Sequence, residues 1–316
     1  MKTVLFHREF RRFQGGHLKV WQYFNHVRAA PGHRGVVRFT ADSVWDESNP
    51  WRPVRDEVLP WEQPVDADIL FVAGRDWRWL DPAERAESPI PVINMLQHVL
   101  HASPDDPLGR RAFLPNKAIR ICTSSEIAKA INATGIVRGP VFAIPNAIDM
   151  EELNAVPRPP QRDIDLLVLA TKQAPLGRAL VARLDDGGIA LDLIRKEVHR
   201  ADLLRRMARA KVTLYLPNRK EGFYIPAAEG MALGTVVVCP DAIGNRSFCR
   251  DGVNCLLPPY EDDAIVAAVG RALREYDQLG HLIDGGLETA REHDLAIERA
   301  TFHDLLSRVD ELWAGA

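Results

Sequence analysis

Two glutamates, Glu221 and Glu229, flank the predicted start of a helix, which Pro226 marks near its first turn. A helix start presents unpaired backbone N–H groups and the positive end of the helix dipole, so it is suited to hold a phosphate group. A carboxylate beside it can accept hydrogen bonds from sugar hydroxyls. The combination predicts a site for a nucleotide sugar. Taken alone, two glutamates around a helix start are more often a surface pair that stabilises the helix dipole.

The elements that must position these glutamates belong to a longer alternation of strands and helices. Short continuous apolar runs, typical of strands buried on both faces of a parallel sheet, alternate with helical patterns in both halves of the chain. The alternation predicts an α/β fold of two doubly wound domains, with ligand held in the cleft at the carboxyl ends of the strands. The predicted strands lie at 4–6, 36–39, 69–72, 91–95, 119–123, 141–144, 166–169, 189–194, 212–216 and 236–238. The predicted helices lie at 17–27, from 124, and at 177–185, 201–209, 226–233, 261–274 and 294–313.

A proline-rich stretch at 156–160 predicts a linker, because closely spaced prolines exclude a helix or a central strand. We therefore expect an N-terminal domain over 1–155 and a C-terminal domain over 156–290. A C-terminal helix over 291–316 is expected to pack back on the first domain.

Composition and charge argue against nucleic-acid-binding, zinc-binding, disulfide-rich and membrane-spanning proteins. The net charge of −3 gives no basic field for nucleic acid, so no nucleic-acid partner is expected. The four cysteines are irregularly spaced and fit neither a zinc pair nor a disulfide scaffold. The N-terminus has too short an apolar run for a signal peptide, and no run is long enough to cross a membrane. We expect a cytoplasmic protein, with peripheral membrane contact left open.

The segment 221–238 reads E-G-F-Y-I-P-A-A-E-G-M-A-L-G-T-V-V-V. It resembles the E-G-F-G-x-P-x-x-E-A-M-A-x-G-x-P-V-V signature of family 4 glycosyltransferases. The likeness continues in register through Asp241, Gly244 and 250–259, and upstream 144–149 resembles the family's domain-crossing I-P-N-G-V-D element. The strong match covers roughly residues 212–260, and order and spacing extend it over the rest of the chain.

The resemblance implies a GT-B fold: two Rossmann-like domains, with the donor bound mainly by the C-terminal one and no metal or other cofactor required. It implies retaining transfer of a sugar from a nucleotide diphosphate, of UDP or GDP type, to a hydroxyl acceptor (a glycan, a lipid-linked or a small molecule). Glu229 matches the acid that binds the donor ribose, and Glu221 matches the acid near the transferred sugar. The residues that match the loop gripping sugar and phosphate are Gly222, Phe223, Tyr224 and Ile225.

The resemblance also implies a cation just after the first strand of the C-terminal domain, which neutralises the leaving diphosphate. Lys172 is our candidate, with Arg178 as second choice. In the N-terminal domain, Gly15 and Gly16 fall where the family has a paired-glycine loop, and His17 follows them as a residue of this phosphate or acceptor loop. His98 lies just past a predicted strand, where the family often keeps a histidine near the donor sugar.

Several positions depart from the family pattern: Ile243, Ser247, Cys255 and Ala147. The stretch between Lys172 and Glu221 is also short for the family. A β-α unit that helps to cradle the nucleotide base is thus expected to be reduced or lost, which leaves base contacts to 195–198. Two alternatives stay open beside the transferase: a non-catalytic GT-B protein that binds a sugar nucleotide or a partner, and a GT-B epimerase.

Overall fold

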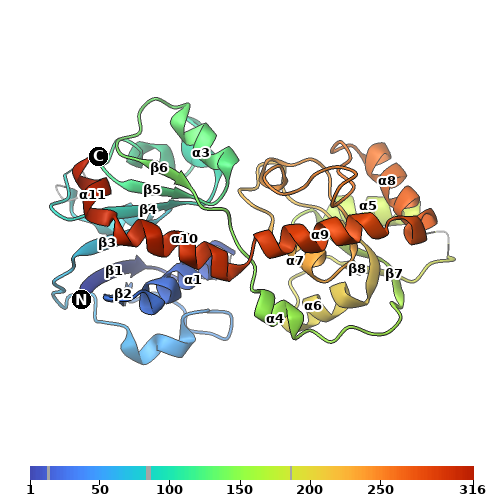
Figure 1. The fold of residues 1–316 in the computed structure, drawn as a ribbon, viewed down its shortest axis with the longest axis horizontal. Helices are drawn as coiled ribbons and strands as arrows, with labels where there is room; N and C mark the ends of the chain where they lie inside the picture. Colours follow the sequence, from blue (N-terminus) through green and yellow to red (C-terminus); the bar gives the residue numbers. More distant parts are fainter. Residues whose placement is uncertain (13–14, 83–86, 186) are drawn as a thin grey trace. The chain divides into compact units, whose positions relative to one another are not determined.

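The computed structural model describes residues 1–12, 15–82, 87–185 and 187–316. The chain forms two compact units (Figure 1). Unit 1 comprises Met1–Pro145 and Glu298–Ala316, and unit 2 comprises Asn146–Ile297.

The units divide at Pro145 and Asn146, ahead of the proline-rich stretch that we expected to be the linker. Packing explains the difference. Leu153 of helix α4 (Met150–Asn154) is fully buried in the core of unit 2. The backbone N–H of Ile148 also donates to His293 O at 2.9 Å, which ties this segment into the same unit. Residues 146–155 and 291–297 therefore belong to unit 2, and the last 19 residues, Glu298–Ala316, belong to unit 1.

Unit 1 is built on a six-stranded sheet with the order β2-β1-β3-β4-β5-β6, and all neighbouring strands are parallel. The strands are β1 (Lys2–Arg8), β2 (His33–Phe39), β3 (Ile69–Ala73), β4 (Val92–Leu96), β5 (Ile119–Cys122) and β6 (Val141–Ala143). The α-helices are α1 (Gly15–Ala29), α3 (Ser125–Asn132), α10 (Leu295–Ser307, which crosses the unit boundary) and α11 (Val309–Ala314). Short 3-10 turns are η1 (Arg52–Glu57), η2 (Asp76–Trp79), η3 (Val99–Ala102) and η4 (Arg110–Phe113).

Unit 2 has a four-stranded parallel sheet with the order β10-β9-β7-β8. Its strands are β7 (Ile164–Leu169), β8 (Leu191–Ile194), β9 (Ala210–Tyr215) and β10 (Val236–Val238). Besides α4, its helices are α5 (Ala174–Leu184), α6 (Arg200–Arg209), α7 (Ile225–Ala232), α8 (Asp262–Arg274) and α9 (Gly280–Glu292). Two 3-10 turns, η5 (Ile243–Asn245) and η6 (Tyr276–Gln278), lie among them.

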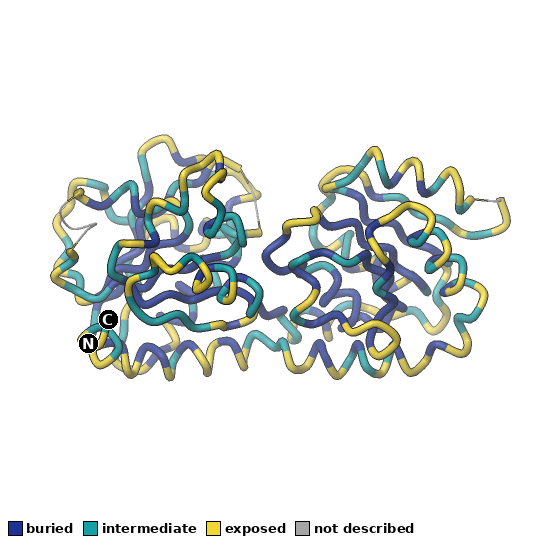
Figure 2. Tube along the Cα trace, turned by 90° about the horizontal axis from the view of Figure 1, so that it is seen from above, coloured by how far each residue is buried: buried dark blue, intermediate teal, exposed yellow. Residues whose placement is uncertain are grey.

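Each sheet is covered on both faces, as the continuous apolar strands predict. In β7, Leu167 and Leu169 belong to a core shared with α6 and α7, while Leu166 and Val168 belong to a second core shared with α5 and α8. Figure 2 shows the same pattern, with buried residues along the strands and exposed residues on the outer sides of the helices. The predicted α/β class with two doubly wound parallel sheets is confirmed.

Some element bounds differ from the sequence predictions. Strand β1 extends to Arg8, and α1 begins at Gly15, so Gly15 and Gly16 are the first residues of the helix rather than the end of a loop. The predicted C-terminal helix is broken at Arg308 into α10 and α11. Residues 41–64 are irregular apart from η1, although Trp51 among them is fully buried.

Candidate functional site

The topology of unit 2 brings Lys172 and Glu221 to one point of the sheet. From β7 the chain passes to β8 on one side, and then returns to β9 on the other side of β7. In doubly wound sheets, the carboxyl ends of two strands at such a reversal form the crevice that holds ligands. Lys172 follows β7, and Glu221 follows β9.

The two side chains form an ion pair, with Lys172 Nζ at 2.6 Å from Glu221 Oε1. The same carboxylate oxygen accepts the backbone N–H of Asn218 at 3.2 Å. The Lys172 ammonium also lies 5.3 Å from the centre of the Tyr224 ring. The lysine side chain is 42% exposed and the glutamate side chain only 12%, so the cation faces solvent and the anion is held by the loop.

The loop from Gly222 to Ile225 leads into α7, whose N-terminus carries Pro226 and no side-chain cap. The aromatic side chains of the loop point inward. Phe223 stacks on Phe248 with ring centres 4.6 Å apart, and Tyr224 is 1% exposed. Because these side chains fill the core, the loop can offer a ligand its backbone, as an anion site at a helix start requires.

Gly244 holds this loop from the other side. A Cβ added at Gly244 would lie 2.8 Å from Glu221 Cβ and 3.0 Å from its carbonyl carbon. The close approach requires glycine, because real Cβ atoms essentially never come so near to a backbone. Close packing against Glu221 thus gives a physical reason for the glycine at position 244, which matches the family pattern.

Glu229 lies inside α7, and its side chain is 3% exposed. Its Oε1 lies 2.8 Å from Nη2 of Arg200, the first residue of α6. Arg200 also pairs with Glu152 of α4, at 2.7 Å. Burial raises the pKa of Glu229, Arg200 opposes this rise, and Glu152 adds to it. Sequence reasoning missed Arg200 and Glu152, since nothing in their spacing connects α4 and α6 to α7.

Two other predicted parts of this region are solvent-facing. Arg178 is exposed within α5, whereas Lys172 lies before the helix, ahead of its N-cap Gln173. The loop that joins β8 to α6 carries Arg195, Lys196 and Glu197, all exposed. The loop occupies the position at which we expected base contacts.

The remaining predicted residues belong to unit 1. Gly16 lies against Gln97, whose Nε2 donates to Gly16 O at 3.4 Å, so the start of α1 meets the end of β4. His98, the next residue, accepts the backbone N–H of Leu100 through Nδ1 at 3.1 Å and caps the turn η3. His98 is thus engaged in its own turn.

His17 is held by a buried charge pair that sequence reasoning did not connect with it. Its Nδ1 lies 3.0 Å from Arg8 Nη2, and Arg8 forms an ion pair with Asp76. Arg8 ends β1 and Asp76 follows β3, the two strands between which the order of unit 1 reverses. Burial, together with Arg8, lowers the pKa of His17 to about 4, so the ring is neutral near pH 7.

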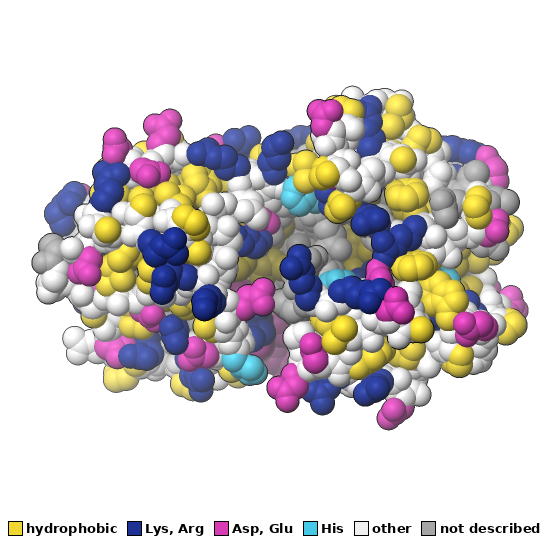
Figure 3. Space-filling model, turned by 180° about the vertical axis from the view of Figure 1, so that it is seen from behind, with side chains coloured by type: hydrophobic (Ala, Val, Ile, Leu, Met, Phe, Trp, Pro, Cys, Tyr) yellow, Lys and Arg dark blue, Asp and Glu magenta, His cyan; other side chains and the backbone are white. Residues whose placement is uncertain are grey.

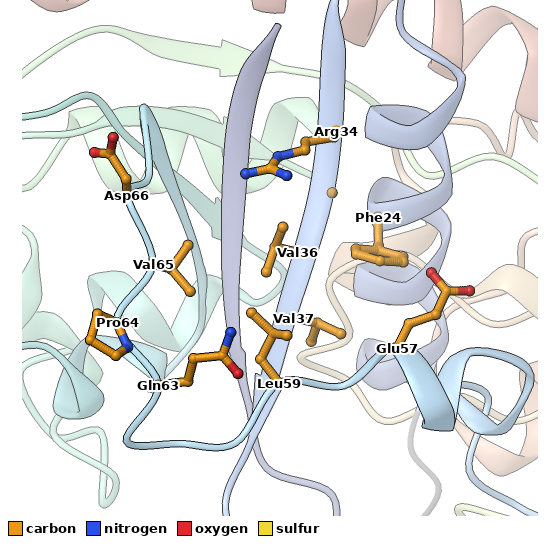
Figure 4. Close-up of a pocket in the computed structure, with 11 residues that line it drawn as sticks. Phe24, Arg34, Val36, Val37, Glu57, Leu59, Gln63, Pro64, Val65 and Asp66 are labelled. Carbon is orange, nitrogen blue, oxygen red and sulfur yellow. The ribbon is translucent and has the colours of Figure 1, made fainter.

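A surface pocket in unit 1 lies apart from these residues. A pocket of about 290 Å³ in unit 1 lies beside edge strand β2, between Phe24 of α1 and the segment Gln63–Asp66 (Figure 4). It contains none of the predicted site residues. On the face shown in Figure 3, basic and acidic side chains are interspersed over both units, in keeping with the small net charge.

Comparison with known proteins relates the sequence to a family of glycosyl transferases. Residues 150–275 match the sequence profile of the family described as glycosyl transferases group 1. The chain resembles the family 4 glycosyltransferases. It is 29% identical over 249 residues to the MMP alpha-(1->4)-mannosyltransferase of Mycolicibacterium hassiacum. The aligned residues make up 72% of this chain and 58% of that relative. The chain thus spans less than two thirds of the relative's length.

Solved structures show that the fold is GT-B. Anabaena Alr3699/HepE, crystallised with UDP-glucose, superposes with a TM-score of 0.75 at 15% identity, over 97% of this chain and 100% of that one. The sucrose-phosphate synthase of Thermosynechococcus elongatus gives a TM-score of 0.73 at 14% identity, over the whole of both chains. The GT-B expectation and the resemblance to family 4 are confirmed. Among the described residues, no helix is both long and apolar enough to span a membrane.

Proposed function

We propose that this chain is a retaining, metal-independent glycosyltransferase that moves a sugar from a nucleotide-diphosphate donor to a hydroxyl acceptor. The observation that carries the proposal is the arrangement in unit 2. A solvent-facing Lys172 and a held Glu221 meet at the carboxyl ends of β7 and β9, and the uncapped start of α7 follows in the same loop. A buried Glu229 completes the set on that helix.

The donor would bind with its diphosphate at the start of α7 and its ribose hydroxyls on Glu229. Phosphate oxygens would attract the Lys172 ammonium away from Glu221, since the pair is partly exposed and therefore weak. Glu221 could then accept hydrogen bonds from hydroxyls of the transferred sugar. A preplaced cation and a helix dipole both stabilise the charge that grows on the departing diphosphate.

Transfer with retention needs no protein nucleophile in a front-face mechanism. The bond from the anomeric carbon to the diphosphate oxygen breaks, and the bond to the acceptor oxygen forms on the same face. The acceptor proton passes to the departing phosphate oxygen. The protein residues that matter for this step are therefore those that hold the diphosphate, above all Lys172.

The comparisons support a nucleotide-sugar donor. The Anabaena protein was crystallised with UDP and glucose and with UDP-glucose, and it is matched over its full length by this chain. The chain thus matches the whole length of a GT-B structure that holds such a donor. In our chain the segment 195–198, of which 195–197 are exposed, is left to contact the base.

A thermal-shift panel of UDP, GDP, UDP-sugars and GDP-sugars tests the proposal. A ligand that binds the folded state raises the melting temperature once its concentration exceeds its dissociation constant. We expect a shift with one nucleotide class, and transfer from the matching sugar nucleotide that survives EDTA with the anomeric configuration kept. If no nucleoside diphosphate shifts the melting temperature, the donor-site assignment is wrong.

A further inference from the structure

In unit 2, the Arg200 guanidinium pairs with two carboxylates that lie on different helices. Arg200 Nε lies 2.9 and 3.0 Å from the two oxygens of Glu152, and Nη2 lies 2.7 Å from Glu152 Oε2. The same Nη2 lies 2.8 Å from Glu229 Oε1. The three residues belong to α6, α4 and α7, so the cluster joins the three helices beside the donor site.

The two carboxylates differ in their exposure to water. The side chain of Glu229 is 3% exposed, whereas those of Arg200 and Glu152 are 38% and 40% exposed. A carboxylate removed from water takes up a proton unless a cation compensates for the lost hydration. Glu229 therefore depends on Arg200 far more than Glu152 does.

The charged groups that face Glu229 act in opposite directions. Burial raises the pKa of Glu229, Arg200 from α6 lowers it, and Glu152 from α4 raises it through like-charge repulsion. The hydroxyl of Tyr215, from β9, is also coupled to Glu229, and burial raises its pKa well above the usual range, so it stays neutral. Burial lowers the pKa of Arg200, but the attraction of Glu229 and Glu152 outweighs it, so the guanidinium is charged at every working pH.

We propose that Arg200 is a positioning residue of the donor site, which keeps Glu229 ionised and oriented toward the ribose, while Glu152 competes for the same cation. The inference rests on the proposed function, in which Glu229 receives the ribose hydroxyls. An ionised carboxylate accepts hydrogen bonds at both oxygens, but a protonated one must donate at one of them. Nucleotide affinity should therefore follow the ionisation of Glu229.

The proposal makes predictions of opposite sign for two neighbouring variants. Arg200→Gln removes the cation and should move the ionisation of Glu229 to higher pH. Glu152→Gln removes the repulsion, releases Arg200 to Glu229, and should move the ionisation to lower pH. A purely structural role would give two variants that lose affinity by similar factors at every pH.

The test is calorimetric titration of UDP and of GDP into the full chain, from about pH 5.5 to about pH 9. For Arg200→Gln we expect roughly tenfold weaker binding or more near pH 6, recovering as the pH rises, because one pKa unit changes the ionised fraction about tenfold. Glu152→Gln should bind at least as well as the wild type at low pH. Arg200→Lys should restore part of the affinity.

Arg206→Gln is the matched control on the same helix. Arg206 pairs with Asp192 and Asp202, at 33% exposure, and does not contact Glu229 in the ion pairs of the described residues. Its pH profile should equal that of the wild type. Equal profiles for Arg200→Gln and the wild type, or a uniform loss in both the Arg200 and the Glu152 variants, would overturn the proposal.

A second measurement separates this inference from the proposed function. Carbon-13 NMR of labelled glutamate carboxyls, assigned with Glu229→Gln, follows the titration of Glu229 with no nucleotide present. If the wild type binds neither UDP nor GDP, the donor site itself is rejected. The NMR titration would still test whether Arg200 controls the ionisation of Glu229. An unchanged Glu229 titration in Arg200→Gln would reject the role of Arg200.

Discussion

Both units place a cation and a carboxylate where their strand order reverses, but the two pairs differ in access to water. In unit 1, Arg8 and Asp76 have side chains that are 6% and 13% exposed, and Arg8 also contacts His17. In unit 2, Lys172 and Glu221 are 42% and 12% exposed. The same topology thus yields an enclosed pair whose partners are committed to each other and an open pair whose cation can exchange its partner for a ligand. We infer that the first pair supports the fold and that the second serves the donor.

The largest expected effect is on stability in unit 1. Arg8→Met leaves Asp76 buried without its cation and should lower the free energy of unfolding by about 3–5 kcal/mol. Lys172→Met should change it by less than about 1 kcal/mol, because the pair is partly exposed. All seven tryptophans lie in unit 1, so tryptophan fluorescence during urea unfolding measures the stability of the Arg8 variant. For the Lys172 variant, urea unfolding is followed by circular dichroism.

The double variant Arg8→Met with Asp76→Asn is the control for that comparison. It removes the unpaired charge and should recover part of the loss. Equal costs for the Arg8 and Lys172 variants would contradict the distinction between an enclosed and an open pair.

For catalytic activity we expect the opposite order, with the larger effect from Lys172→Met, which costs little stability. We expect Lys172→Met to lower kcat by about 10²–10³-fold, as the loss of a group that stabilises transition-state charge does. Arg178→Met, our second-choice cation, should keep most of the activity, since Arg178 is exposed on α5. Steady-state kinetics with the sugar nucleotide found in the thermal-shift panel measures both. A larger loss in Arg178→Met would transfer the role to that residue.

Gly244→Ala tests whether the donor loop of unit 2 must be held closely. The added Cβ would meet the backbone and Cβ of Glu221 at 2.8–3.0 Å, so the loop must shift. We expect donor binding to weaken, because overpacking, which costs about 1–3 kcal/mol in a well-packed core, displaces the loop that carries Glu221. Gly280→Ala, where a Cβ would have no neighbour within 4 Å, is the matched control. Unchanged affinity in Gly244→Ala would show that the position of Glu221 does not matter.

Unit 1 should also be the more acid-sensitive unit on account of its buried histidines. Burial, with Arg38, lowers the pKa of His7 to about 4, and burial, with Arg110 and His98, lowers that of His101 to about 3. Below their ordinary value of 6.5, the unfolded chain binds protons that the folded chain does not, so stability falls as the pH drops from about 6.5 toward 4. We expect roughly 1–2 kcal/mol per histidine between pH 7 and pH 5.

Urea unfolding of unit 1 at several pH values, again by tryptophan fluorescence, measures this slope. The variant His7→Gln with His101→Gln should have a flatter profile over the same range. A slope equal to that of the wild type would assign the acid sensitivity to other groups.

The difference between the units also explains what the sequence could predict. Glu221 and Glu229 were predictable because they belong to one continuous segment, in which Pro226 and the apolar flanks set the local structure. The two sheets were predictable because strands buried on both faces read as continuous apolar runs. Arg200 and Asp76 were not, because they meet their partners only through the order of strands and helices.

The domain boundary was missed for a similar reason. The prolines at 156–160 favour a linker locally, but the burial of Leu153 and the contact of Ile148 with His293 place the division earlier. Gly15 and Gly16 were expected in a loop, and they instead begin α1, against Gln97 from the end of β4. In each case a contact between distant segments outweighed the local pattern.

The central claim, that the donor is held in unit 2 with its ribose on Glu229, is tested most directly by calorimetry of UDP and GDP with the wild type and with Glu229→Ala. Removing the partner of the ribose hydroxyls should weaken binding of the preferred nucleotide by about 1–3 kcal/mol. Glu275→Ala serves as control, because Glu275 pairs with Arg271 on an exposed part of the same unit. The account predicts that only Glu229→Ala loses affinity. Unchanged affinity in that variant would contradict it.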